Sequence, residues 1–482
     1  MTATETAAPW APAFQILTPD QIEAIHDASM RILGQTGVRI YEPEAIALLR
    51  DAGATVVGDL VTIPASLVEW AVGVAPDNVT IHDRMGKEAM QLGGRRTYFG
   101  TGSDTPNTID PRTGKRRQAT LADVGNFARL CDALDHLDFV MCMGIASDKP
   151  SSVAELFHFR EMLKNTTKPM VYTALDLEAA NKLLEMASIV SGSEEQFRQR
   201  PFGIMYLEPV SPLGFAAEVM QKLLFCAEHG IPCIFMSGML CGGTGPVTQA
   251  GSLALANAES LAGITIAQLK REGAPVVSGG GIIGMDMRTA ISSYSSPEFM
   301  LTMAALSEMA EHYGLPAYGY AGCSDAKSFD EQAAADAALW VMAAQLSGSN
   351  LVHDVGFVES GLTSSLDQIV FTNEMVSKCS RILEGIDVDE ESLAVDVTGE
   401  VGPGGSFLFH KHTRNHKSDN WRPDLEDRTT HGAWVAQGSN TMRDRVRARV
   451  LELLDMHVPE PLPKDVDARL TALVTSAEAG EA

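Results

Sequence analysis

Residues 317–356 read AYGYAGCSDAKSFDEQAAADAALWVMAAQLSGSNLVHDVG, and this stretch decides the fold. It begins with a short apolar run, Ala317–Gly322, and continues through a polar loop into a helix-like segment, Glu331–Leu346. A second apolar run, Leu351–Gly356, ends it. Strand, helix and strand in this order are typical of two parallel strands joined by a crossover helix. The stretch therefore predicts one unit of an α/β fold with a parallel sheet.

The same alternation continues through the chain from about residue 95. The six further predicted strands are Thr97–Thr101, Val140–Gly144, Met170–Ala174, Gly203–Leu207, Cys233–Gly238 and Val276–Gly280. The six further predicted helices are Leu121–Leu134, Val153–Leu163, Leu177–Val190, Ala216–Glu228, Leu253–Arg271 and Pro297–Tyr313. Eight such units over about 280 residues match the size of a (β/α)8 TIM barrel. A doubly wound open sheet is the alternative, but Gly100–Asp104 lacks the third glycine of the phosphate turn that such a sheet would need.

The barrel is predicted to span residues 91–385. Residues 1–90 are predicted to form an N-terminal helical segment, in which Thr18 and Pro19 supply an N-cap and a first-turn proline. The composition changes again after about residue 386, where an acidic run precedes GPGGSFLFHKHTRNH at 402–416. Residues 386–482 are therefore predicted to be a C-terminal helical extension that packs on the barrel.

Composition and charge exclude several classes of function. The 482 residues carry 37 Lys and Arg against 62 Asp and Glu, a net charge of −25, which repels phosphate backbones and anionic lipids. No apolar run is long enough to span a bilayer, and the first residues lack the pattern of a secretory signal. Seven cysteines without C-x-x-C spacing indicate reduced thiols. We expect a cytoplasmic protein without nucleic-acid or membrane partners.

The loops that follow the strands are where a barrel of this type places its active site. Seven of the eight put a carboxylate at or just beyond the strand end: Asp104, Asp148, Asp176, Glu208, Asp286, Asp325 and Asp354. Many of these acids would serve as ordinary helix N-caps. A rim this rich in carboxylates nevertheless has a negative potential that favours a cationic ligand.

Aromatic residues stand at the same level as these acids: Tyr98, Tyr206, Tyr320, Phe329 and Phe357. A quaternary ammonium cannot donate a hydrogen bond, so proteins hold it with aromatic faces and nearby carboxylates. The alternative is that these rings only fill the barrel.

Two groups of histidines are candidates for a functional role. His353 ends the eighth strand, where it would anchor a substrate carboxylate or relay a proton, or else satisfy a backbone carbonyl. His410, His412 and His416 have a spacing that invites a metal site. No cysteine or carboxylate with matching spacing lies nearby, so a structural or partner-docking turn is favoured, and no tightly bound metal is expected.

Five segments together resemble the trimethylamine methyltransferase family: YFGTGSDTPNTID, YLEPVSPL, YGYAGCSDAKSFDEQAA, NLVHDVGFVESGLTSSLDQIV and GPGGSFLFHKHT. The resemblance runs from about residue 15 to about residue 450, and it implies a (β/α)8 barrel. Founding members of the family carry a pyrrolysine in the loop after the seventh strand. This chain has only standard residues there, with Ser328 and Phe329 near the expected place. It therefore resembles the non-pyrrolysine members that act as glycine betaine:corrinoid methyltransferases.

The resemblance implies transfer of a methyl group from a quaternary amine, most simply glycine betaine, to cobalt(I) in a corrinoid held by a separate partner protein. This chain has no D-x-H-x-x-G corrinoid signature of its own. The resemblance also suggests a homo-oligomer. Two alternatives stay open: direct methyl transfer involving tetrahydrofolate, and a binding protein that senses a quaternary amine without turning it over.

Loop position and chemistry assign roles within this hypothesis. His353 and Glu208 are the candidate catalytic residues, with Glu208 supplying negative charge near the ammonium and His353 holding the substrate carboxylate. The candidate substrate-binding residues are Tyr98, Tyr206 and Phe357 around the ammonium, Gln332 beside the carboxylate, and Asp104, Asp325 and Glu359 shaping the mouth.

Overall fold

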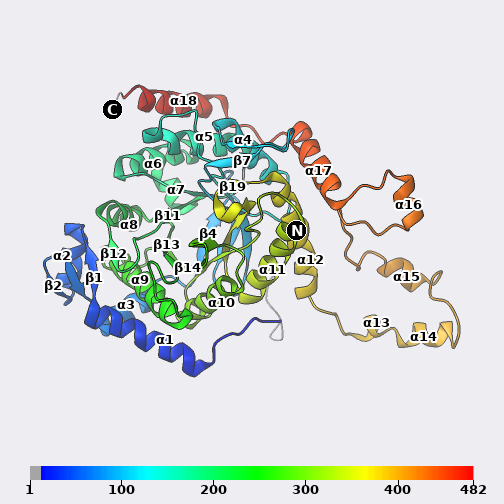
Figure 1. Cartoon of the computed structure of the whole chain (residues 1–482), viewed down its shortest axis with the longest axis horizontal. Helices are drawn as coiled ribbons and strands as arrows, with labels where there is room; N and C mark the ends of the chain where they lie inside the picture. Colours follow the sequence, from blue (N-terminus) through cyan, green and yellow to red (C-terminus); the bar gives the residue numbers. More distant parts are fainter. Residues whose placement is uncertain (1–11, 481–482) are drawn as a thin grey trace.

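Eight parallel strands form a barrel in the computed structural model, which describes residues 12–480 (Figure 1). Neighbouring strands follow the order β6-β17-β16-β14-β13-β11-β10-β9. A parallel bridge between Gly100 and Phe139 joins the first strand to the last. The amide of Asp104 also donates to the carbonyl of Cys142 across this junction, at 2.8 Å. The predicted TIM-barrel fold is confirmed.

All eight predicted strands and the helices between them are present. The strands are β6 (Tyr98–Thr101), β9 (Val140–Met141), β10 (Met170–Tyr172), β11 (Gly203–Leu207), β13 (Cys233–Leu240), β14 (Val276–Asp286), β16 (Ala317–Tyr320) and β17 (Leu351–Val355). The outer helices are α4 (Leu121–Asp132), α5 (Ala154–Asn165), α6 (Leu177–Ser191), α8 (Ala217–His229), α9 (Gln249–Lys270), α10 (Pro297–His312), α11 (Glu331–Ser347) and α12 (Leu366–Leu383). A 3-10 turn, η2 (Ser151–Val153), precedes α5, and α7 (Glu194–Gln199) follows α6.

The N-terminal segment is more mixed than predicted. Its helices are α1 (Pro19–Arg31), α2 (Pro43–Asp51) and α3 (Ala65–Val74), with a π-helical turn, η1 (Ile32–Thr36), after α1. Thr18 caps α1 in a capping box, as its sequence predicts. The strands β1 (Val38–Ile40), β2 (Thr55–Val57) and β3 (Leu60–Thr62) lie between these helices, and β4 (Val79–His82) pairs with β5 (Glu88–Leu92) in a hairpin. Strands of three residues are too short for an alternation pattern to reveal. The first 11 residues of the predicted segment lie outside the described part of the chain.

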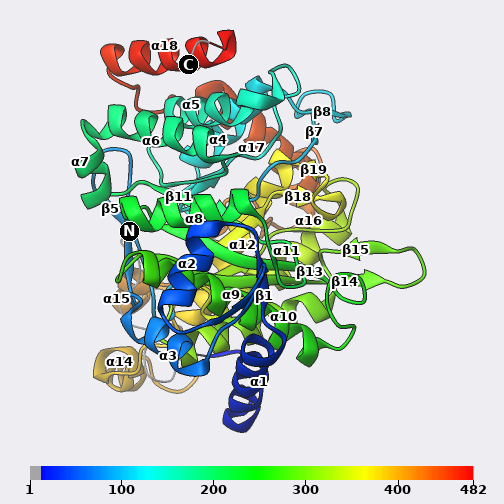
Figure 2. The ribbon, with the colours of Figure 1, turned by 90° about the vertical axis from the view of Figure 1, so that its left-hand side faces the viewer.

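The carboxyl ends of the barrel strands carry several additional hairpins. The extra strands are β7 (Asn107–Ile109), β8 (Arg116–Gln118), β12 (Gly214–Phe215), β15 (Ile291–Ser293), β18 (Phe357–Val358) and β19 (Thr363–Ser364), with a 3-10 turn, η3 (Glu359–Gly361). Figure 2 shows the β14–β15 hairpin projecting on one side of the molecule, with β7 and β8 toward the same side and β5 on the other. We call the end with these hairpins the mouth of the barrel.

The C-terminal residues divide into two parts. The helices α17 (Met442–Met456) and α18 (Lys464–Ala479) pack on the barrel, α17 against α12 and α4, and α18 against α5 and α6. The short helices α13 (Glu390–Leu393), α14 (Val395–Val401), α15 (Lys411–His416) and α16 (His431–Ala436) instead lie to one side of it (Figure 1). Of the described residues, no helix is both long and apolar enough to cross a membrane.

Candidate active site

Four aromatic rings converge inside the barrel from strands β11, β16 and β17. The ring of His353 is stacked on that of Tyr318, with centroids 4.5 Å apart, and lies 4.6 Å from that of Tyr320. The ring of Tyr206 lies 6.0 Å from Tyr318 and 6.4 Å from His353. We call these four residues the aromatic cluster. Their electron-rich faces suit a cation that has no N–H to donate.

Two glycines of β14 make room for this cluster. A Cβ atom at Gly279 would lie 2.8 Å from Cβ of Tyr318, and one at Gly281 would lie 2.6 Å from the hydroxyl of Tyr320. The glycine run that follows the start of β14 in the sequence is therefore part of the barrel wall, where it lets two large side chains pack against the strand.

Asp354 places a buried carboxylate beside the aromatic cluster. The residue has no exposed surface, and neither carboxylate oxygen has a hydrogen-bond partner among the described residues. Its Oδ1 lies 2.9 Å from Nδ1 of His353, but the contact lacks hydrogen-bond geometry, and both nitrogens of His353 are also without a partner. Its negative charge contributes to raising the pKa of Tyr318 and Tyr320. Buried polar atoms are almost always paired, so these unpartnered atoms make this place a candidate ligand site.

The backbone explains how Asp354 reaches the interior next to His353. Strict alternation along β17 would send the two side chains to opposite faces. The pairing of β17 with β6 shifts between Val352 and Val355, and Asp354 has a φ of 75°, in the left-handed region. This irregularity re-aims one side chain at the place where the ligand would bind.

Glu208 supplies a second carboxylate at the end of β11. The hydroxyl of Tyr206 donates to its Oε2 at 2.8 Å and also lies 2.8 Å from Sδ of Met236. A Cβ atom at Gly238 would lie 1.9 Å from Oε1 of Glu208, so only glycine leaves room for this carboxylate. Together with Ser211 and Thr244, Glu208 and Gly238 line a pocket of about 340 Å³ that opens at the mouth.

The negative charge of the site comes from the carboxylates and not from the tyrosine hydroxyls. Burial raises the pKa of Tyr206, Tyr318 and Tyr320 well above that of an ordinary tyrosine, so their hydroxyls are neutral. Burial also raises the pKa of Glu208, against the lowering effects of the Tyr206 hydroxyl and of His353. A cation bound here would lower the pKa of Glu208 and be held by the resulting charge.

The loop that carries Glu208 is fixed from behind by Glu259 of α9. This fully buried carboxylate accepts from the hydroxyl of Ser211 at 2.7 Å, from the amide of Leu213 at 2.6 Å and from the hydroxyl of Ser237. These three hydrogen bonds all go to the loop and to β13, so Glu259 positions the loop.

The sequence of this chain matches known methyltransferases over almost its whole length. Residues 3–480 match the family described as trimethylamine methyltransferase (MTTB). The chain belongs to the trimethylamine methyltransferase family. Trimethylamine methyltransferase MttB of Desulfitobacterium hafniense (strain DSM 10664 / DCB-2) is 32% identical over 461 residues, which cover 95% of this chain and 93% of the relative. A glycine betaine methyltransferase of Desulfitobacterium hafniense (strain Y51) is 34% identical over 467 residues, or 96% and 97% of the two chains.

A solved structure supports the fold of this trimethylamine methyltransferase family chain. The crystal structure of the Methanosarcina barkeri monomethylamine methyltransferase (MtmB) aligns with a TM-score of 0.56 at 12% identity, covering 92% of this chain and 89% of that one. The prediction of a methyltransferase is confirmed by the family, whose members transfer the methyl group to a corrinoid protein.

Three predicted residues of this family chain lie elsewhere than expected. Tyr98 is the first residue of β6, at the end of the barrel opposite the mouth, where its hydroxyl accepts from the amide of Gln91 in the β4–β5 hairpin. Gln332 lies on the exposed first turn of α11. Phe357 packs closely on Gly102 and lies 6.3 Å from Tyr294, outside the four-ring cluster.

Two predicted mouth residues tie loops together. Asp325 accepts from the hydroxyls of Ser293, Ser295 and Ser360 and from the amide of Tyr294. Burial acts to raise its pKa, but these hydrogen bonds outweigh burial and leave it lowered.

Glu359 forms an ion pair with Arg116 of β8, at 2.8 Å, and accepts from Thr363. It therefore connects the loop after β17 to the β7–β8 hairpin at the rim of the mouth.

Asp104 stands apart, in a group with Cys142 and His158 whose ligand atoms lie within 4.8 Å of one another. Burial raises the pKa of Asp104 to about 6 and lowers that of His158 to about 4. These residue types are common metal ligands. However, Nε2 of His158 accepts from the amide of Ala146, and the Cys142 thiol donates to the carbonyl of Gly144. The His158 imidazole is therefore neutral and, like the Cys142 thiol, hydrogen-bonded within the mouth, whereas Asp104, with a pKa of about 6, is mostly ionised at neutral pH.

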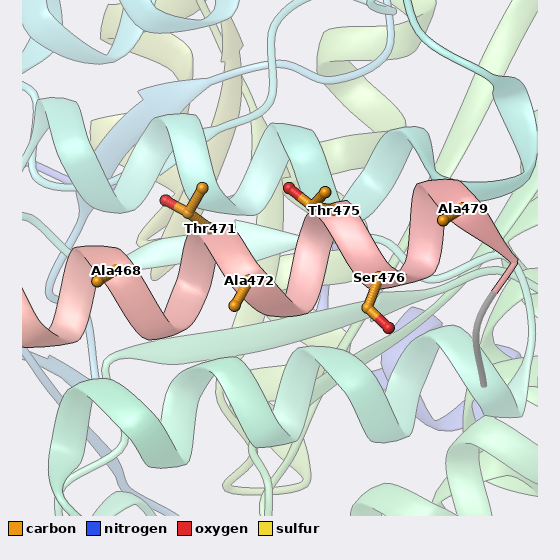
Figure 3. A pocket seen from close by; sticks show the side chains of 6 residues that line it. All are labelled: Ala468, Thr471, Ala472, Thr475, Ser476 and Ala479. Atoms are coloured by element: carbon orange, nitrogen blue, oxygen red, sulfur yellow. The ribbon is translucent and has the colours of Figure 1, made fainter.

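The His410 group and a hollow along α18 offer no comparable chemistry. Nε2 of His410 lies 3.2 Å from Glu400, and Nδ1 of His416 lies 2.7 Å from Asp419, so hydrogen bonds within the segment engage these two imidazoles. A hollow of about 630 Å³ lies along α18 and is lined only by Ala, Thr and Ser (Figure 3). Neither feature adjoins the aromatic cluster.

The sequence prediction missed Tyr318 and did not assign a role to Asp354. Tyr318 lies two residues before Tyr320, so the period of a strand places both side chains on one face, and this signal was available. Asp354 was recognised only as one of seven acids, because the irregularity in β17 leaves no mark in the sequence.

Proposed function

We propose that this methyltransferase takes its methyl group from a quaternary amine of the betaine class, with glycine betaine as the substrate and a corrinoid protein as the acceptor. One observation carries the proposal: the orphaned carboxylate of Asp354 lies beside four aromatic rings inside the barrel. Aromatic faces with a nearby carboxylate bind a permanent cation that cannot donate a hydrogen bond. The similarity to a glycine betaine methyltransferase supports the same substrate class.

A quaternary amine also fits the neutral hydroxyls of the cluster. Its C–N bond breaks with the electron pair staying on nitrogen, so the leaving group is a neutral tertiary amine and needs no proton. When its own protein is docked at the mouth, the corrinoid would supply cobalt(I) as the nucleophile that accepts the methyl group. The residues of this chain bind the cation, orient one methyl group toward the mouth and exclude water.

The positive charge of the substrate disappears during the reaction, so the binding site must not hold it too strongly. Glu208 fits this requirement because burial raises its pKa, which disfavours the charged form and so weakens its hold on the cation. We assign the ammonium to Tyr206, Tyr318, Tyr320 and the two acids Asp354 and Glu208, and the betaine carboxylate to the unpartnered Nε2 of His353. Asp325, Glu359 and Asp104 keep the role of shaping the mouth, and Phe357, first assigned to the ammonium, is now given the same role.

The mouth carries an apolar rim suited to a docking protein. Six of the eight loops after the barrel strands expose a large apolar side chain: Ile145, Leu175, Val210, Val247, Met287 and Ile291 on one hairpin, and Leu362. Exposed apolar groups gathered around one opening indicate a protein-interaction site. The 340 Å³ pocket is far smaller than a corrin ring, so a corrinoid would lie across the mouth, held by its own protein.

The first experiment measures methylation of free cob(I)alamin by the purified protein, with glycine betaine, proline betaine, carnitine and trimethylamine in parallel. We expect a methylcobalamin spectrum with glycine betaine and none with trimethylamine. Turnover with trimethylamine alone would overturn the substrate assignment. No turnover with any amine, even with the corrinoid protein added, would overturn the reaction and favour folate chemistry or ligand sensing.

A second experiment tests docking at the rim. We expect Ile291→Asp, at a residue 61% exposed on the β14–β15 hairpin, to raise KM for the corrinoid protein about 10-fold, the cost of one lost hot-spot contact. Its rate with free cob(I)alamin should not change. Val57→Asp, on the distant strand β2 and 70% exposed, is the matched control. Equal effects of the two variants would exclude docking at this hairpin.

A further inference from the structure

Residues 386–420 form an arm that has no core. The arm contains α13, α14 and α15 and leaves the barrel after α12 (Figure 1). None of its residues is buried. The chain is held on the barrel again only from Trp421 onward, where the indole donates to Ser377 and the amides of residues 424–426 donate to Glu374.

The helices of the arm are too short to be stable without a supporting surface. They have four, seven and six residues, whereas isolated helices shorter than about 12–15 residues are marginal in water. Two of them are nevertheless capped, α13 by a capping box at Asp389 and α15 by His410 as its N-cap, whereas α14 has no side-chain cap. A segment with defined helices and no buried residue needs a second surface on which to fold.

The arm also exposes a dense group of apolar side chains. They are Ile386, Val388, Leu393, Val395, Phe407, Leu408 and Phe409, with Phe409 92% exposed. Consecutive exposed apolar residues on a folded segment are typical of a protein interface.

The distribution of charge along the arm indicates which protein provides the second surface on which the arm folds. Residues 386–401 contain six acids and no Lys or Arg, whereas residues 402–420, the rest of the arm, contain three Lys and Arg and one acid. In a two-fold symmetric pair of identical chains, a surface of one chain contacts the same surface of the other, and the two segments run in opposite directions. The acidic half of one arm then faces the basic half of the other, so the arm is complementary in charge to itself.

The position of the arm argues against the corrinoid protein as its partner. Helix α12 begins next to the mouth and runs toward the opposite end of the barrel, where the arm leaves it. Figure 2 shows α14 and α15 on the side away from the β14–β15 hairpin. A protein docked over the mouth of the same chain would not reach them.

We propose that residues 386–420 dock on a second copy of this chain and hold a two-fold dimer together, with Phe407, Leu408 and Phe409 at the centre of the contact. The dimer is the unit in which the arm becomes buried. This interface is separate from the active site and does not depend on the proposed substrate.

The test measures the molar mass of the full-length protein by sedimentation equilibrium. We expect the native chain to show at least twice the mass of one chain, 51.7 kDa, and the double variant Phe407→Asp/Phe409→Asp to show the mass of one chain. Val458→Asp, at an 83% exposed residue outside the arm, should keep the native mass. A monomeric native protein, or a double variant with the native mass, would overturn the proposal.

Hydrogen exchange on the native protein provides a test that requires no variant. Amides of α14 and α15 should be protected at concentrations where the dimer forms, and should lose this protection on dilution to the monomer. Unprotected amides in the assembled protein would contradict the proposal, because they would show that the arm remains free in solution.

Discussion

The carboxylate of Asp354 is buried, and neither of its oxygens has a hydrogen-bond partner among residues 12–480. An unpaired buried group of this kind lowers the free energy of unfolding. We expect Asp354→Asn to lower kcat/KM for the betaine about 100-fold, within the range for removing one partner of a buried charge pair. The same variant should unfold at an equal or higher temperature, because an unsatisfied charge is removed and Asn tolerates the left-handed backbone.

Asp325→Asn is the matched control for this prediction. That carboxylate accepts four hydrogen bonds, so its loss should lower the free energy of unfolding by about 2 kcal/mol. Kinetics and thermal melts of both variants check the pair. A large loss of stability in Asp354→Asn would show that the carboxylate is structural.

Tyr206 controls the protonation of Glu208. Burial raises the pKa of Glu208, and the hydrogen bond from Tyr206 is the largest opposing effect. Activity that needs the carboxylate is lost as the pH falls through this pKa. In Tyr206→Phe the pKa rises further, so the acid limb of the kcat/KM profile should move up by about 0.7 pH unit, equivalent to about 1 kcal/mol.

Tyr313→Phe tests whether this effect is specific. Its hydroxyl contacts His26 and Asn257 outside the barrel interior, so the acid limb should stay in place. If the acid limb of the kcat/KM profile does not move in Tyr206→Phe, the Glu208 carboxylate has no role in the reaction.

The sequence placed Glu208, Tyr206 and His353 among the candidates because each lies at or near the end of a predicted strand. The structure brings Tyr206 and His353 together in the aromatic cluster, with Glu208 hydrogen-bonded to Tyr206. Tyr98 was assigned to the substrate ammonium, although it is the first residue of its strand and therefore lies at the end opposite the mouth. The inward turn of Asp354 depends on the pairing shift between β17 and β6, a tertiary feature that no single-residue pattern encodes.

At the scale of elements, β13 shows how a strand shapes the pocket. We expect Gly238→Ala to lower kcat/KM at least 10-fold, because its Cβ would displace the Glu208 carboxylate that lies 1.9 Å from it. The fold should tolerate the change, since only the end of a side chain has to move. Gly243→Ala, with 3.5 Å to the nearest atom, should keep full activity. Steady-state kinetics and circular dichroism separate the two outcomes.

The barrel strands were predictable because each is a buried apolar run that alternates with a long helix. The small strands β1, β2 and β3 were not, since three residues carry too little pattern and their pairing depends on distant partners. In the sequence, the arm was visible only as a change in composition. Its pattern of apolar residues does not reveal the surface on which it packs.

At the scale of the whole molecule, Arg447 fastens α17 to the barrel. It forms a bidentate ion pair with Asp367, a buried residue of α12, and donates to the carbonyl of Pro111. Arg447→Met leaves that carboxylate buried and unpaired, so the free energy of unfolding should fall by about 3 kcal/mol.

Arg449→Met, on the same helix, removes an ion pair with Glu452 in which both side chains are exposed. It should cost less than about 1 kcal/mol. Urea denaturation of the two variants checks the difference. Equal losses would show that the helix itself, rather than the ion pair, supplies the attachment.

The pairing of β1 with β12 joins the amino-terminal sheet to the loop that carries Glu208. The amide of Arg39 donates to Leu213 at 2.8 Å, and the amide of Tyr41 donates to Phe215 at 3.0 Å. Because of this pairing, residues 1–90 are not an independent module that recombination between related genes could exchange alone. A recombinant that inherits this segment from one parent and residues 210–216 from the other would mismatch both, so the two regions are expected to be inherited together.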